Sequence, residues 1–204
     1  MIDMDAVDRQ IEAGRAELVA SDKAILSLAT RKRIWRAMLD PQDHEASYRR
    51  FIELEMMCVR HVQGFWDRAF PGDGRVEEML ALAQELIDRQ TDERQAERRA
   101  RIFVMNVFDE VDDYNAITQP AVFVAQAASG AAFSACNRDP SYYLLIDADD
   151  DDELLPDALD SSYCSASAPA GALNWQPIEE TDVSVRRAFW TWYLDEAIPQ
   201  VLAD

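Results

Sequence analysis

Apolar residues recur at helical spacing through most of the chain, and this pattern predicts helices rather than strands. Val7, Ile11 and Leu18, for example, fall on one side of the first predicted helix. The predicted helices cover about residues 4–19, 22–38, 41–70, 75–89, 92–115, 121–136, 156–168 and 183–198.

Short polar residues and prolines mark where these helices begin and end. Pro41 is expected at the first position of the third helix, and Pro199 is expected to end the last one. The expected capping residues are Asp40, Asp73, Thr91, Thr118 and either Thr181 or Asp182.

The helix over 121–136 differs from the others because small residues recur at every fourth position. Ala121, Ala125 and Ser129 form such a row, which lets another helix approach closely. We therefore expect this helix at the centre of a bundle.

Residues 142–146 have the composition of a short strand, but no strong second strand exists to pair with it. A loop or an extended helical end is favoured there, and residues 168–177 are expected to form a loop. With no internal repeat and no clear linker, the sequence predicts an all-α, single-domain bundle of about seven or eight helices.

Charge is both large and uneven along the chain. The net charge is −19, from 39 acidic and 20 basic residues. Residues 141–204 hold 14 acidic and two basic residues, a balance of −12. This field disfavours nucleic acid and anionic membranes as partners and favours basic proteins.

The three cysteines, Cys58, Cys136 and Cys164, are an odd number, which fits a reducing compartment better than a disulfide framework. The N-terminal residues do not resemble a signal peptide, and the most apolar stretch, 121–136, is too short and polar for a membrane span. A cytoplasmic location is expected.

An acidic run from Asp147 to Glu153 has six acidic residues in seven positions. An EF-hand beginning at Asp147 needs glycine at its sixth position and glutamate at its twelfth, where this chain has Asp152 and Ala158. The run is therefore expected to be an exposed, mobile loop, either simply solvated or used to recognise a partner.

Two further clusters of residues are candidate metal sites, but their sequence patterns support this less strongly. Asp109, Asp112 and Asp113 have spacings that share a helix face and could hold Mg²⁺, although a salt-bridged exposed helix explains them more simply. A zinc site drawn from His61 and the three cysteines lacks paired-ligand spacing. No catalytic or nucleotide-binding motif of the common kinds occurs.

Several segments together resemble the fifth immunity-protein family of bacterial polymorphic toxin systems. Its closing helix motif falls on Arg187 to Pro199, with Tyr193 where a second tryptophan is usual. The other matching blocks are Phe65 to Ile87, Asp149 to Asp157, Asp160 to Ala168 and Gly171 to Trp175. The resemblance covers roughly residues 50–203, which leaves 1–45 as an N-terminal helical extension or a divergent part beside the family-like region 46–204.

The resemblance implies a mostly helical, non-catalytic protein that needs no cofactor and neutralises a co-produced toxin by binding its C-terminal domain. The acidity favours a basic toxin, such as a nuclease, whose active or substrate-binding surface the protein would cover. The residues expected to contact the toxin are Asp149, Asp150, Asp151, Asp152 and Glu153, with Asp157 and Asp160.

Two other functions stay open from the sequence. One is a metal-dependent helical hydrolase or diphosphate-handling enzyme that uses Asp109, Asp112 and Asp113. The other is a helical adaptor that has no toxin as partner.

Overall fold

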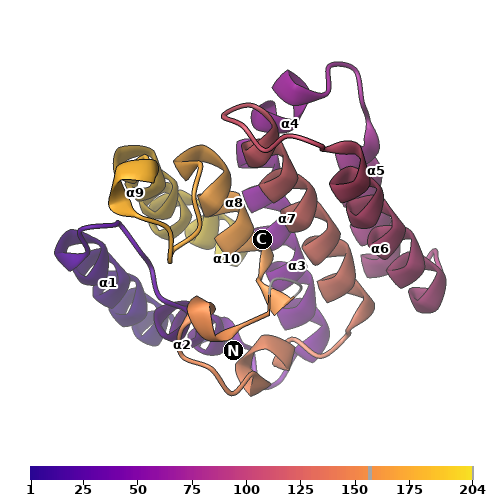
Figure 1. The fold of residues 1–204 in the computed structure, drawn as a ribbon. Helices are drawn as coiled ribbons and strands as arrows, with labels where there is room; N and C mark the ends of the chain where they lie inside the picture. Colours follow the sequence, from indigo (N-terminus) through magenta and orange to yellow (C-terminus); the bar gives the residue numbers. More distant parts are fainter. Residues whose placement is uncertain (156–157, 204) are drawn as a thin grey trace.

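The computed structural model describes residues 1–155 and 158–203, and it confirms the predicted all-α, single-domain fold (Figure 1). No strand occurs in these two ranges. The α-helices are α1 (Met4–Ala20), α2 (Leu28–Met38), α3 (His44–Val62), α4 (Gly64–Ala69), α5 (Arg75–Ile87), α6 (Glu93–Glu110), α7 (Thr118–Cys136), α8 (Ser161–Ala170), α9 (Val183–Trp192) and α10 (Ile198–Ala203). Short 3-10 turns cover Tyr142–Leu145, Asp151–Glu153 and Ile178–Glu180.

Helix α7 lies at the centre of the bundle, as its row of small residues predicted. It packs against α3, α4, α5, α6 and α8, with α5 and α6 on one side and α8 on the other (Figure 1). Ala121, Ala125 and Ser129 are all buried. Where α7 passes α8, a Cβ atom at Gly130 would lie 2.8 Å from the Ser161 hydroxyl, so the close approach requires glycine there.

The N-terminal helices belong to the same core as the rest of the chain. Val7, Ile11 and Leu18 of α1 are buried, and Gly14 faces the side chain of Leu194. Helix α1 packs along α2 and α9 (Figure 1). Residues 1–45 are therefore an integral part of the bundle.

Two helices begin later than the sequence predicted, because a different residue caps them. Ala24 adopts a left-handed conformation with φ of 54°, which excludes it from a helix, and Ser27 caps α2 by accepting from the amide of Thr30. The third helix is capped by Asp43 instead of Asp40, so Pro41 lies in the preceding turn.

Other boundaries also shift. Asp92, one residue after Thr91, caps α6, and α3 ends at Val62, before a separate helix α4. Helix α8 begins at Ser161 with Asp160 as its cap and continues through Pro169, further than predicted.

The last helix does not end at Pro199, contrary to the prediction. A π-helical turn over Tyr193–Ala197 joins α9 to α10, and the amide of Ile198 bonds to the carbonyl of Tyr193. In a regular α-helix the proline ring would clash with the carbonyl of Asp195. The π-helical turn shifts backbone bonding to the fifth preceding residue, and the chain stays helical past the proline.

Candidate functional site

The acidic segment, residues 147–153, is fixed to the N-terminal half of α2. Lys32 Nζ donates to the carbonyl oxygens of Ile146 at 2.7 Å and Ala148 at 2.9 Å. The amide of Ala29 donates to the carbonyl of Asp149 at 3.0 Å. The expected loop is therefore anchored to α2: two of these hydrogen bonds reach the segment itself and the third reaches Ile146 just before it, and residues 151–153 form a 3-10 turn.

Asp151 points into the protein and pairs with Arg31 of α2. Its two oxygens lie 2.5 Å and 3.2 Å from the guanidinium nitrogens, and both side chains are 0% exposed. Burial raises the pKa of Asp151, and the charge of Arg31 opposes this shift. Asp151 cannot contact a partner from this position, which corrects its inclusion in the predicted binding set.

Asp160 is the second carboxylate of this buried cluster. Its Oδ2 lies 2.6 Å from Arg31 Nη2, and its Oδ1 accepts from the amides of Ser162 and Tyr163 at 3.0 Å and 3.1 Å. It therefore caps α8 while it also pairs with α2. Asp160, like Asp151, is excluded from a surface contact by its burial.

The loop that carries the Gly171 to Trp175 motif also reaches this cluster. Asn174 Nδ2 donates to Asp151 at 3.3 Å, and the amide of Asn174 donates to the Tyr163 hydroxyl at 3.0 Å. Lys23 Nζ donates to the Asn174 carbonyl at 3.1 Å. The acidic segment, the start of α8 and the Gly171 to Trp175 loop therefore meet around Arg31, and these contacts hold the acidic segment in place.

The remaining carboxylates of the segment face solvent and give it a concentrated negative charge. No lysine or arginine occurs between residues 139 and 185 of the sequence. Partial burial and the neighbouring Asp150 carboxylate raise the pKa of Asp152. The exposed members are Asp147, Asp149, Asp150, Asp152 and Glu153. Asp157, also predicted to contact the partner, lies outside the described residues.

The cluster proposed for Mg²⁺ does not share a helix face. Helix α6 ends at Glu110, so Asp112 and Asp113 lie in the following turn, where the Asp113 carbonyl accepts from the Thr118 hydroxyl. Glu110 is engaged by Arg75 at 2.7 Å. Within the residues described, no three histidine, cysteine or acidic side chains are grouped to hold a metal ion.

The zinc ligands considered from the sequence are also dispersed. Cys58 and Cys164 are buried thiols, and burial raises the pKa of Cys136 to about 11. His61 stacks on Trp192 with ring centroids 3.7 Å apart. These side chains therefore serve as packing groups of the fold.

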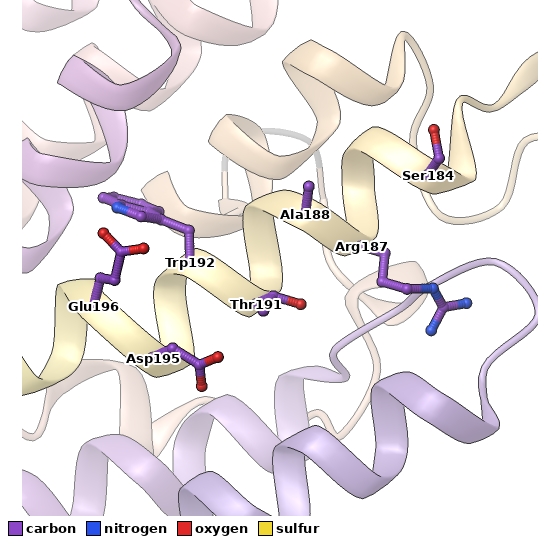
Figure 2. Close-up of a pocket in the computed structure, with 7 residues that line it drawn as sticks. All are labelled: Ser184, Arg187, Ala188, Thr191, Trp192, Asp195 and Glu196. Atoms are coloured by element: carbon purple, nitrogen blue, oxygen red, sulfur yellow. The ribbon is translucent and has the colours of Figure 1, made fainter.

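A shallow groove of about 430 Å³ follows the closing motif along α9 (Figure 2). Arg187 in this groove points toward α1 and donates to the carbonyls of Leu18 and Ser21, the latter at 2.8 Å. Asp195 pairs with Arg15 of α1 at 2.6 Å. These contacts hold α9 and the following π-helical turn against α1, so Arg187 and Asp195 are already engaged within the protein.

The fold and this site define a class: an acidic, all-helical protein that presents carboxylates on a rigid segment. None of the helices described has the length and apolar character needed to cross a membrane. A family model described as immunity protein Imm5 matches residues 11–200, so the chain belongs to this family of immunity proteins. The match takes in residues 11–45, which lay outside the motifs quoted from the sequence. A comparison with curated proteins found no match.

Proposed function

We propose that this immunity protein neutralises a co-produced toxin in the cytoplasm of the producing cell, without catalysis, by binding the toxin's C-terminal domain through its acidic segment. The observation that carries the proposal is that the segment combines exposed carboxylates with a buried anchor. The contacting residues are Asp149, Asp150, Asp152 and Glu153, with Asp157 as a further member.

Rigidity is what makes these carboxylates effective in binding. Arg31 holds the Asp151 side chain, and Lys32 holds the backbone carbonyl of Ala148, before any partner arrives. Less conformational entropy is then lost when a complex forms, and the negative potential is already in place to attract a basic surface.

A nuclease is the toxin class that this charge fits best. An enzyme that cuts nucleic acid binds phosphates through lysine and arginine side chains. Closely spaced carboxylates can occupy the same positions and so cover the surface needed by the substrate.

Charge reversal at three exposed positions tests the proposal. The variant is Asp149→Lys, Asp150→Lys and Asp152→Lys, and Asp151 is left intact because its replacement would disturb the core. The matched control reverses Asp8, Asp67 and Glu78, which are exposed on α1, α4 and α5. Both variants change the net charge equally, so they separate a local contact from a general electrostatic effect.

The probe is the C-terminal domain of the toxin encoded beside this gene, with affinity measured by titration calorimetry and protection measured by inhibition of the toxin. We expect the acidic-segment variant to bind at least about 100-fold more weakly, as for the loss of several interfacial charge pairs. The control should retain most of the affinity. Equal affinities for the two variants would remove the acidic segment from the interface.

A further inference from the structure

An apolar groove, here called the α6–α7 groove, lies between α6, α7 and the chain that leads into and out of the acidic segment. Its volume is about 650 Å³, which is enough to receive one or two large side chains. Its apolar lining includes Met105, Phe108, Phe133, Tyr142, Tyr143 and Ile146.

Two of these side chains are unusually exposed to solvent for large hydrophobic residues. Met105 is 51% exposed and Tyr142 is 49% exposed. Ile102, one turn before Met105 on α6, is 52% exposed, and Leu145 beside the groove is 73% exposed. An apolar surface of this kind costs free energy in water and is typical of an interaction site.

The groove and the acidic segment are continuous along the chain. Ile146 lines the groove and is followed directly by Asp147, and the segment then leads back to Ala158 and Leu159 in the groove wall. Arg101 also lines the groove, but it is paired with Glu97 at 3.3 Å. The exposed carboxylates beside the groove therefore favour an occupant with positive charge next to its apolar group.

We propose that the α6–α7 groove receives an aromatic or long aliphatic side chain of the toxin, from a segment in which lysine or arginine residues flank that side chain. This inference rests on the proposed function and adds the apolar half of the interface to it. The carboxylates accelerate encounter, while the buried side chain slows dissociation. Met105 suits this role because its flexible thioether adapts to the shape of the inserted group.

The test removes the exposed apolar contacts without changing charge. The variant is Met105→Gln with Tyr142→Ser, and the matched control is Met4→Gln with Tyr114→Ser. Met4 and Tyr114 are 47% and 53% exposed and do not line the groove. Association and dissociation rates are measured by surface plasmon resonance against the C-terminal domain of the adjacent toxin, and melting temperatures confirm that each variant is folded.

We expect the dissociation rate of the groove variant to rise at least about tenfold, with the association rate changed by less than about twofold. The control should match the unchanged protein. Met105→Gln alone is the second variant if the double variant does not fold, with an expected rise of at least about threefold.

Dissociation rates equal to the control would overturn the groove's role and leave the proposed function standing, provided that charge reversal in the acidic segment still weakens binding. Absence of any complex with the unchanged protein would instead overturn the proposed function, and the groove inference with it.

Discussion

Arg31 and Asp151 lie 120 residues apart in the sequence, yet their side chains form an ion pair at 2.5 Å from which solvent is excluded. The pair joins helix α2 to the most acidic part of the chain. Asp160 adds a second carboxylate at 2.6 Å, and the guanidinium lies 5.4 Å from the ring centroid of Trp190. Arg31 therefore stabilises both the fold and the shape of the acidic segment.

Replacing Arg31 tests how much the fold depends on this pair. Arg31→Met leaves two carboxylates buried without a cation, so the free energy of unfolding should fall by about 3–5 kcal/mol. The control is Arg36→Met, an exposed position on the same helix, with an expected change within about 0.5 kcal/mol. Urea unfolding measures both, and similar values for the two variants would contradict the structural role of Arg31.

Lys32 provides a way to loosen the acidic segment without opening the core. Lys32→Met removes the donor to the carbonyls of Ile146 and Ala148, so amide hydrogen exchange over 146–153 should accelerate by about tenfold. The control, Arg36→Met, removes the same charge from an exposed position on the same helix. Unchanged exchange in the acidic segment of Lys32→Met would show that the lysine does not anchor it.

Glu55 on α3 makes the stability of the fold depend on pH in a predictable direction. Both of its carboxyl oxygens are buried without a hydrogen bond of regular geometry, although the Ser134 and Ser161 hydroxyls, which donate to the carbonyls of Gly130 and Ala127, lie close enough to oppose part of the effect of burial. Burial raises the pKa of Glu55 well above its ordinary value. The folded state therefore favours the protonated form of Glu55. The free energy of unfolding falls as the pH rises from the pKa that Glu55 has in the unfolded chain to the higher pKa that it has in the folded protein.

Glu55→Gln should remove this dependence. At about pH 8 the variant should be more stable than the unchanged protein by at least about 1 kcal/mol, the scale of a buried unsatisfied group. At about pH 4 the advantage should disappear. Thermal and urea unfolding across this range provide the measurement, and a variant that is less stable at about pH 8 would show that the ionised carboxylate is satisfied in the fold.

Tyr193, in the π-helical turn after α9, forms a buried hydrogen bond to helix α2. Its hydroxyl accepts from Trp35 Nε1 at 2.8 Å, and both side chains are buried. Tyr193→Phe should lower the free energy of unfolding by about 1–3 kcal/mol, because the indole N–H is left without an acceptor. Tyr193→Trp should also destabilise the protein, since indole donates but does not accept.

The exposed Tyr142 serves as the control for this substitution. Tyr142→Phe should change the free energy of unfolding by less than about 0.5 kcal/mol. An equal effect at Tyr142 and Tyr193 would mean that the Trp35 hydrogen bond contributes nothing measurable.

The helical fold could be predicted because its determinants are local. The row of Ala121, Ala125 and Ser129 correctly placed α7 at the centre, since small side chains directly permit close packing. Helix ends were less predictable where two capping residues compete, as Thr91 and Asp92 do before α6. The helix through Pro199 was missed because a π-helical turn can accommodate a proline that a regular α-helix cannot.

The candidate site could be predicted only in part, because its key contacts join distant segments. Asp150, Asp151 and Asp152 are consecutive and chemically alike, yet only Asp151 is turned inward. Asp151 is turned inward because it pairs with Arg31, and no local sequence pattern links these two residues. The α6–α7 groove was missed for the same reason, since its walls come from four separate parts of the chain.

The association rate between this protein and the C-terminal domain of the toxin proposed as its partner tests the role of the acidic segment most directly. It is measured at low and moderate salt for the unchanged protein, for the lysine variant at Asp149, Asp150 and Asp152, and for the control at Asp8, Asp67 and Glu78. We predict that the first variant associates at least about tenfold more slowly at low salt and loses most of the salt dependence, while the control loses far less. An acidic-segment variant that associates as fast as the control, with the same response to salt, would contradict this role.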